Sequence, residues 1–249
     1  MLPGLAVKDG LIRHPFDLEF GTRTSGLVAG RHLQSRHREG RDATAYYAVA
    51  PSVFHALMAR WQRTRPPAPV DSYTFIDLGA GMGRALLLAA EYPFGNVVGV
   101  EMHPALTRIA RRNMALWRRR AQSTAPMRML CRNAADFPLP LGPCLVFLFN
   151  PFGAPVLRRV LRAWRSAMRS RTAQAPTEAP IDVLYVNNEQ DHVLEAEPGF
   201  VRLFSGRVRR SPADTAADRT ILTSQPDAEY AAMPWEDCSI YRWLGKRDV

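Results

Sequence analysis

FIDLGAGMGR, from Phe75 to Arg84, decides the fold, because it joins a short apolar run to a glycine-rich turn and then to a helical pattern. The glycines are at positions 79, 81 and 83, and an acidic residue, Asp77, precedes them. Such a turn lets a ligand lie against bare backbone at the carboxyl end of a strand, where the next helix offers free N–H groups. The stretch therefore predicts a ligand-binding loop in a parallel α/β fold.

Strand and helix patterns alternate on both sides of this loop. Continuous apolar runs predict strands buried on both faces, at Thr74–Leu78, Asn96–Glu101, Met127–Cys131, Cys144–Phe149 and Ile181–Val186. Helical patterns cover residues 82–92, 104–119 and 154–169, and the runs 200–208 and 238–243 predict an antiparallel hairpin at the sheet edge. The predicted fold class is α/β, with a Rossmann-like, seven-stranded, doubly wound sheet.

The N-terminal part has few strand-like runs. Residues 44–61 repeat apolar residues at helical spacing after Pro51, and the proline-rich stretch RTRPPAPVDS (63–72) favours an extended connection. We therefore expect a helical N-terminal cap over residues 1–65 and a main domain over residues 66–249.

Composition and length fit a globular protein, with 249 residues of which 47% are hydrophobic. No apolar stretch has the roughly 18 residues of a membrane span, and the N-terminus lacks signal-peptide features, so we expect a cytoplasmic protein without a membrane partner. Cys131, Cys144 and Cys238 lack metal-ligand spacing. We expect no metal site and no disulfide framework, with Cys131 and Cys144 as small buried hydrophobes.

The formal charge of +10 raises the question of an anionic partner. Only two of the 33 basic residues are lysines, and the chain is rich in Ala and Pro, a bias that GC-rich coding produces by itself. Nucleic acid is therefore a partner that we keep open but do not favour. The arginines of the helices 104–119 and 154–169 are interpreted as solvated faces, although two adjacent basic helices would also steer an acidic partner.

The spacing of the loop discriminates between ligands. Dinucleotide sites favour G-x-G-x-x-G, whereas this loop is G-x-G-x-G after an acidic residue that would repel a phosphate and pair with an ammonium group. Glu101 ends the second strand, where a doubly wound fold places a carboxylate that binds ribose hydroxyls. A purely structural interpretation stays open, in which Asp77 bonds backbone N–H groups of the turn and Glu101 is a solvated strand end.

DLGAGMG followed by VVGVE resembles the first two cofactor motifs of the class I S-adenosylmethionine-dependent methyltransferases. The resemblance implies S-adenosylmethionine as the cofactor. It implies cofactor-binding roles for a set of residues that follow the first three strands: Asp77, Gly79, Ala80, Gly81, Gly83, Glu101, Met102, Asn133 and Ala134. Asn133 and Ala134 are at the adenine position, where the family commonly has Asp; Asp136 is the alternative there.

The fourth strand leads into FLFNPFG, which is similar to the Asn/Asp-Pro-Pro-aromatic motif of methyltransferases that act on nitrogen, without the second proline. The resemblance implies that Asn150, Pro151 and Phe152 form the reaction site and that Asn150 also borders the cofactor. The alternative is a plain strand-to-helix stop, because Asn and Pro are common at helix starts. FGTRTSG (20–26) and residues 47–51 resemble the cap of a bacterial branch that shares the NPF motif, so Thr24 and Tyr47 are candidates for closing the methionine end.

The predicted function is transfer of a methyl group to a nitrogen acceptor such as a protein side-chain amine. Three alternatives remain: methylation of a nitrogen or oxygen on RNA or on a small metabolite, a non-catalytic S-adenosylmethionine-binding interaction domain, and a dehydrogenase, which the loop spacing disfavours. The sequence does not decide the acceptor or the oligomeric state.

Overall fold

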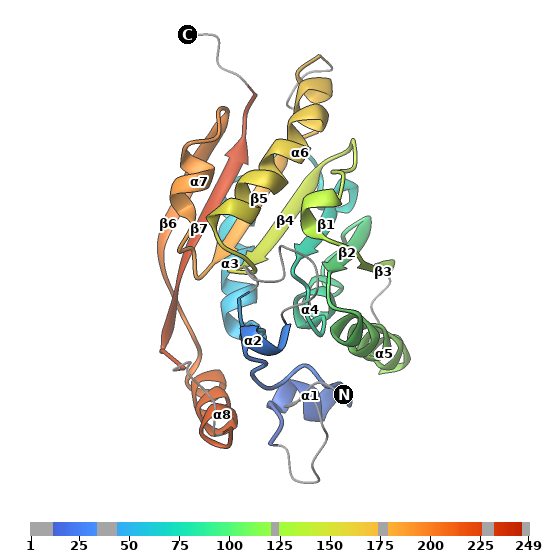
Figure 1. Ribbon diagram of the computed structural model, residues 1–249, viewed down its shortest axis with the longest axis vertical. Coiled ribbons are helices and arrows are strands. Elements are labelled where there is room, and N and C mark those ends of the chain that lie inside the picture. Colours follow the sequence, from blue (N-terminus) through green and yellow to red (C-terminus); the bar gives the residue numbers. More distant parts are fainter. Residues whose placement is uncertain (1–11, 34–43, 121–124, 174–178, 226–231, 246–249) are drawn as a thin grey trace.

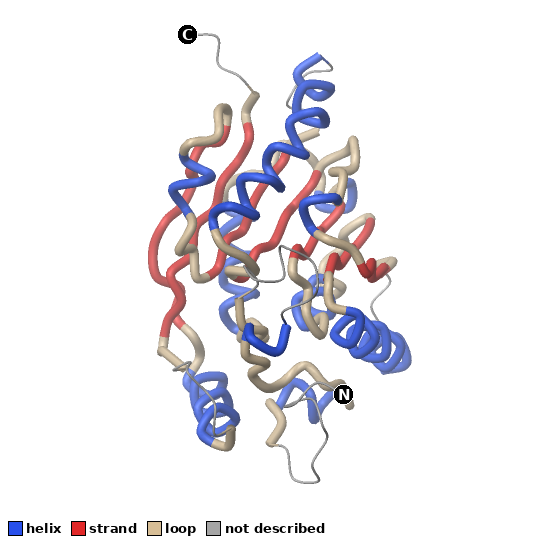
Figure 2. Tube along the Cα trace, viewed as in Figure 1, coloured by secondary structure: helices blue, strands red, loops and turns tan. Residues whose placement is uncertain are grey.

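The protein folds around one seven-stranded sheet with helices on both faces (Figures 1 and 2). The computed structural model describes residues 12–33, 44–120, 125–173, 179–225 and 232–245. The strand order is β3-β2-β1-β4-β5-β7-β6, and β7 runs antiparallel to both of its neighbours. The strands are β1 (Thr74–Leu78), β2 (Asn96–Glu101), β3 (Met127–Cys131), β4 (Cys144–Phe149), β5 (Ile181–Val186), β6 (Phe200–Arg209) and β7 (Trp235–Trp243).

The helices divide between the two faces of the sheet and the end where the parallel strands finish. They are α1 (Pro15–Phe20), α2 (Gly30–Leu33), α3 (Pro51–Arg63), α4 (Arg84–Ala89), α5 (Pro104–Arg120), α6 (Ala154–Ala173), α7 (Asp191–Glu195) and α8 (Pro212–Thr223), with short 3-10 turns η2 (Val70–Ser72) and η3 (Ala134–Asp136). Figure 1 shows α1, α2 and α8 beyond the carboxyl ends of the parallel strands.

Two hydrophobic clusters fill the space between the sheet and its helices. One joins α3, α4 and α5 to the sheet, and the other joins η3, α6 and α7 to the opposite face. Successive strand residues alternate between them, as with Phe75 in the first cluster and Ile76 in the second. Both faces of the central strands are therefore buried, which explains their continuous apolar sequences.

The predicted α/β fold class and its seven-stranded doubly wound sheet are confirmed. The five strands predicted from apolar runs have the expected bounds. Strand order reverses between β1 and β4, because the chain first adds β2 and β3 on one side and then β4 and β5 on the other. Ligands of open α/β sheets bind at the carboxyl ends of the strands at such a reversal.

The end of the chain differs from the prediction. The strands β6 and β7 do pair antiparallel, but they do not form a hairpin at the edge, because α8 connects them and β7 lies between β5 and β6. The sequence SPADT carries the signal for α8: Ser211 caps it by accepting a bond from the Asp214 N–H, and proline is at the first helical position. The helix predicted over 82–92 is shorter, α4 beginning at Arg84 after Gly83 in the left-handed conformation.

The N-terminal part packs closely against the sheet through α3. Trp61 is fully buried and donates from Nε1 to Asp182 on β5 at 2.6 Å. Arg242 on β7 donates from Nε to the same carboxylate at 2.7 Å. The division into a cap (1–65) and a main domain stays a prediction, and within the described residues α3 contributes to the first hydrophobic cluster.

None of the helices in the described residues is long and apolar enough to cross a membrane. The three cysteines are free thiols. Cys144 is buried as expected, whereas the predicted burial of Cys131 is wrong, because this residue is the exposed end of β3.

Candidate functional site

A cavity lies where the carboxyl ends of β1, β2, β3 and β4 meet. Its walls surround about 790 Å³ of space, which includes the open solvent at its mouth. The lining residues are Leu33, Thr44, Ala45, Tyr46, Tyr47, Gly79, Val100, Glu101, Met102, His103, Leu106, Arg132, Asn133, Ala134, Phe149, Pro151, Phe152 and Val156. Eight of them are among the predicted site residues: Tyr47, Gly79, Glu101, Met102, Asn133, Ala134, Pro151 and Phe152.

The glycine loop after β1 is held against β2, because the carbonyl of Val100 accepts bonds from the N–H groups of Gly79 (2.9 Å) and Ala80 (3.1 Å). Gly79 alone of the three glycines lines the cavity, and a Cβ there would lie 2.4 Å from the Cβ of Pro151. A Cβ on Gly81 would lie 2.1 Å from the ring of Tyr46. The loop thus needs glycine at both positions because protein side chains approach its backbone. This corrects the expectation that the glycines leave bare backbone for a ligand, because Pro151 and Tyr46 fill the space next to Gly79 and Gly81.

The remaining loop positions lie outside the cavity wall. Ala80 is 5% exposed, and Gly83, with a φ of 89°, begins α4 and faces Ala110 of α5. The cofactor roles predicted for Ala80, Gly81 and Gly83 stay predictions.

Two carboxyl groups, those of Asp77 and Glu101, lie near the ends of neighbouring strands at this cavity. Glu101 lines it, and its carboxylate accepts bonds from the N–H of Gly81 (3.0 Å) and of His103 (2.7 Å). Asp77 is not among the lining residues; it is only 4% exposed, and its side chain makes no hydrogen bond within the described residues. Burial and the nearby charge of Glu101 raise the pKa of Asp77 to about 8. Burial also raises the pKa of Glu101, against the lowering effect of the bonds from the backbone.

This pair of carboxyls explains what the cavity favours electrostatically. An isolated buried carboxylate is costly, and a second one beside it increases the cost. A cation placed near Asp77 would remove that cost, whereas a phosphate would add to it. The interpretation of Asp77 as a group that bonds the turn N–H groups has no support in the structure, since no such bond forms.

The segments after β2 and β3 form another part of the cavity wall. Asn133 lines it and caps η3, its Oδ1 accepting a bond from the N–H of Ala135 at 3.0 Å. Ala134 and Met102 lie in the same wall, whereas Asp136 is exposed and does not line the cavity. The sequence analysis did not select His103 and Arg132, which also line the cavity. His103 directly follows Met102, and Arg132 directly precedes Asn133.

Asn150 follows β4 in a strained conformation. Its φ is 38°, in the left-handed region that side chains other than glycine rarely adopt, and its backbone carbonyl accepts a bond from the Thr44 hydroxyl. The side chain is buried, and its Oδ1 has no hydrogen-bond partner within the described residues. Pro151 and Phe152 line the cavity next to it. A buried acceptor without a donor is costly, so this atom fits a ligand donor.

The two residues predicted to close the methionine end have different positions. Tyr47 lines the cavity, and its hydroxyl interacts with Asp218 on α8. Thr24 lies outside the cavity wall and is fully buried, its hydroxyl donating to Asp17 at 2.8 Å and accepting from Nε of Arg84 at 2.7 Å. The residue that covers the glycine loop is the neighbouring Tyr46, which the sequence did not distinguish from Tyr47.

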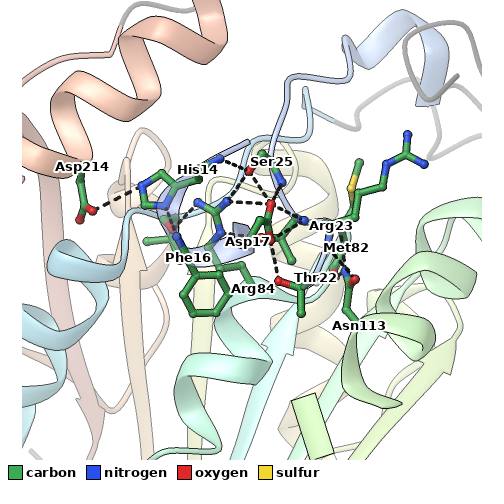
Figure 3. A network of polar contacts seen from close by, with 12 residues as sticks. His14, Phe16, Asp17, Thr22, Arg23, Ser25, Met82, Arg84, Asn113 and Asp214 are labelled. Atoms are coloured by element: carbon green, nitrogen blue, oxygen red, sulfur yellow. Dashed lines mark hydrogen bonds and ion pairs between the residues drawn. The ribbon is translucent and has the colours of Figure 1, made fainter. Parts of the chain in front are cut away.

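A buried polar network holds the N-terminal segment against the start of α4 (Figure 3). Asp17 accepts bonds from the hydroxyl of Thr22 (2.7 Å), the N–H of Ser25 (2.7 Å) and the Thr24 hydroxyl, and lies 3.7 Å from the guanidinium of Arg84. Burial alone would raise the pKa of Asp17, but Arg84 and the three hydroxyls hold it below its usual value. The network therefore keeps a charged carboxylate inside the protein and connects residues far apart in sequence.

The basic helices are not adjacent, contrary to expectation. The helices α5 and α6 each carry six arginines and no acidic residue, but they pack on opposite faces of the sheet. Arg165 of α6 pairs with Glu197 at 2.9 Å. An acidic partner that contacts both helices at once is therefore not supported by their placement.

No family model matches the sequence, and no curated protein sequence matches it. Solved structures are similar at low identity. A putative methylase from Haemophilus influenzae is 13% identical with a TM-score of 0.46, over 77% of this chain and 99% of that chain. A SAM-dependent methyltransferase from Geobacter sulfurreducens in complex with S-adenosyl-L-homocysteine is 12% identical with a TM-score of 0.45, over 86% and 96%. The cyclase SpnF is 14% identical with a TM-score of 0.48, over 78% and 82%. A fold does not determine function, so the residues of the site carry the proposal below.

Proposed function

We propose that this protein is an S-adenosylmethionine-dependent methyltransferase that acts on a nitrogen acceptor such as a protein side-chain amine. One observation carries the proposal: the carboxyl ends of four parallel strands meet at one cavity that Glu101 lines, and beside Glu101 lies the buried carboxyl of Asp77, whose side chain has no hydrogen bond within the described residues. The carboxyl ends of parallel strands are where such folds bind nucleosides, and two carboxyl groups there suit a nucleoside with a cationic amino-acid end.

The cavity residues fit the parts of the donor in order. Glu101 is a hydrogen-bond acceptor for ribose hydroxyls, and Asp77 is a counter-charge for an ammonium group. Asn133, Ala134 and Met102 border the position for the adenine ring. A dinucleotide fits less well, because its pyrophosphate would lie near two carboxyl groups.

When bound, S-adenosylmethionine supplies a methyl group already activated on a sulfonium. The chain therefore needs mainly to position the acceptor, because a lone pair held in line about 3 Å from the methyl carbon provides much of the rate enhancement. In this proposal Oδ1 of Asn150 accepts a hydrogen from the acceptor nitrogen, and Phe152 packs against the acceptor. The acceptor nitrogen loses its proton to solvent, so no strong base is required.

The buried side chain of Asn150 supports the assignment of this reaction site. An unpaired buried carbonyl costs free energy, and such costs concentrate at functional sites. A plain strand-to-helix stop does not require it, whereas the left-handed conformation also occurs at Asn187 between β5 and α7. The unpaired atom is an acceptor, which suits a nitrogen that still carries hydrogen.

The test is methyl transfer from tritiated S-adenosylmethionine to extracts of the source cells, with protease and ribonuclease digestion to identify the acceptor class. Asn150→Gly removes the amide while glycine tolerates the φ of 38°. The matched control is Asn187→Gly, because Asn187 follows β5 with a φ of 50°. Neither asparagine is itself in the cavity wall, but Asn150 stands between the lining residues Phe149 and Pro151, whereas no neighbour of Asn187 lines the cavity. We expect protease-sensitive label that Asn150→Gly reduces at least a hundredfold and Asn187→Gly leaves unchanged, with cofactor affinity kept in both.

Each other result has a definite meaning. Label that is sensitive to ribonuclease, or that stays in the small-molecule fraction, rejects a protein acceptor in favour of RNA or a metabolite. Full labelling by Asn150→Gly rejects the assigned reaction site. A protein that binds the cofactor but transfers no label to any fraction is a binding domain and not an enzyme.

A further inference from the structure

Two asparagines follow neighbouring parallel strands in the same left-handed conformation. Asn150 follows β4 with a φ of 38°, and Asn187 follows β5 with a φ of 50°. The carbonyl of Asn187 accepts a local bond, from the N–H of Glu189 at 2.9 Å. The carbonyl of Asn150 instead accepts a bond from the hydroxyl of Thr44, a residue 106 positions away in the sequence. The two turns thus share a conformation but differ in what holds them.

The segment that carries Thr44 is itself fixed. Residues 44–47 all line the cavity. Within this segment, the backbone of Tyr46 exchanges bonds of 3.0 and 2.8 Å with Val28, and the Tyr46 hydroxyl donates to the Thr24 carbonyl at 2.7 Å. The hydroxyl of Thr44 therefore extends from an anchored backbone into the cavity wall.

The turn after β4 has contacts on both sides of the peptide that joins Asn150 to Pro151. Thr44 bonds the carbonyl oxygen of this peptide. On the proline side, a Cβ added to Gly79 would lie 2.4 Å from the Cβ of Pro151, so the proline packs directly on the glycine loop. A left-handed residue persists only where its surroundings determine its conformation. These two contacts therefore fix the backbone from which the buried side chain of Asn150 extends.

We propose that Thr44 is a positioning residue for methyl transfer, which holds the carbonyl of Asn150 and thereby places the Asn150 amide that bonds the acceptor nitrogen. This inference rests on the proposed function. The acceptor lone pair must lie in line with the methyl group, and a displacement of about 1 Å costs on the order of a hundredfold in rate. Because Thr44 acts through Asn150, it affects the rate of transfer and not the affinity for the cofactor.

The test compares Thr44→Val, which removes the hydroxyl at nearly constant shape, with Thr44→Ser, which keeps it. Initial rates of protease-sensitive labelling are measured with saturating tritiated S-adenosylmethionine and a fixed amount of extract from the source cells. Calorimetry gives the dissociation constant of S-adenosylhomocysteine. We expect Thr44→Val to lower the rate about ten- to a hundredfold with less than about a twofold change in that constant, and Thr44→Ser to stay within about threefold of the wild-type rate.

The matched control is Thr215→Val. The Thr215 hydroxyl also donates to a backbone carbonyl, that of Ser211 at 2.8 Å, and this residue does not line the cavity. Loss of this bond should leave the labelling rate unchanged. A loss as large as that of Thr44→Val would show that the rate reports a general effect on the fold, and it would overturn the positioning role.

A double-mutant cycle with Asn150→Gly separates positioning from other effects. This substitution removes the amide but keeps the backbone carbonyl that Thr44 bonds. If Thr44 acts through the amide, Thr44→Val should cause no further loss in the Asn150→Gly protein, whose residual rate is followed over long incubations. Losses that multiply in the double variant would mean that Thr44 acts independently of Asn150.

Three further results would also overturn the role of Thr44: a wild-type rate in Thr44→Val, a rate in Thr44→Ser as low as that in Thr44→Val, or a loss of S-adenosylhomocysteine affinity as large as the loss of rate. Each of them leaves the proposed function intact. A wild-type protein that produces no protease-sensitive label would instead reject the proposed function itself.

Discussion

The two sides of the cavity are built in different ways. On the side that we propose to bind the adenosine, Glu101 is the last residue of β2, and Asn133 and Ala134 are in the turn after β3, so all three are held by these strands. On the loop side, Tyr46 comes from a segment that only long-range contacts hold, above all those of Asp17 with residues 22–25 and Arg84. The first side depends on local sequence and the second on a buried charge.

This difference predicts which substitutions change the stability of the fold and which change ligand affinity. Substitutions of Glu101 and Asn133 are expected to act mainly on ligand affinity, because these side chains make only local bonds, to the glycine loop and to the turns that follow β2 and β3. Substitutions in the Asp17 network act on the fold, because a buried carboxylate without its partners is strongly unfavourable.

The largest expected effect is on stability. Asp17→Asn should lower the free energy of unfolding by about 3–5 kcal/mol, because the buried guanidinium of Arg84 loses its counter-charge. The matched control is Glu197→Gln, which breaks the exposed pair with Arg165 and should cost less than about 1 kcal/mol. Urea unfolding curves measure both. Equal effects of the two substitutions would remove the distinction between the two sides.

The next effect is on binding, with stability changing in the opposite direction. Asp77→Asn should weaken S-adenosylmethionine about a hundredfold, because the ammonium group loses a buried counter-charge. Asp136→Asn, an exposed carboxyl outside the cavity, is the control and should bind normally. Titration calorimetry measures the affinities.

The same substitution should stabilise the protein at high pH. Asp77 has a folded-state pKa of about 8, above the unfolded value of about 3.9, so the folded protein keeps a proton that the unfolded chain releases. Stability from this group is therefore lost as pH rises through 4 to 8. Thermal melting at pH 9 should show Asp77→Asn above the wild-type protein, and a lower melting temperature would contradict this assignment.

The pH dependence of binding tests the same carboxyl group without a substitution. If the ionised form of Asp77 binds the ammonium group, affinity should rise about tenfold per pH unit from 6 to 8 and level off above. In the Asp77→Asn variant only the ligand titrates, so its affinity should not show this rise between pH 6 and 8. Glu101→Gln removes the second cause of the raised pKa, so the midpoint should move to lower pH; a midpoint that does not move would mean that the two groups act independently.

The smallest effect is expected at the adenine end. Asn133→Ala should weaken cofactor binding only about three- to tenfold, since Oδ1 already bonds Ala135 and offers the ligand one neutral hydrogen bond. Asn133→Asp should strengthen binding, because a charged acceptor forms a stronger bond with the adenine amino group. Competition with a fluorescent nucleoside analogue resolves such differences.

Sequence alone predicted where these residues lie relative to the strands, for a physical reason. A buried strand followed by a turn fixes its own position, so Asp77, Glu101 and Asn150 are at strand ends as expected. Sequence did not predict Tyr46, because residues 46 and 47 are both tyrosines and only their contacts with Gly81 and Asp218 distinguish them. Nor did it predict the Asp17 network, which joins residues about 60 positions apart that no local pattern relates.

The central claim is tested most directly by calorimetric titration of the full chain at pH 8 with S-adenosylmethionine, S-adenosylhomocysteine and NAD. The account predicts one-to-one binding of both adenosyl ligands, loss of that binding in Glu101→Ala, and no measurable binding of NAD. Binding of NAD without binding of either adenosyl ligand would contradict it.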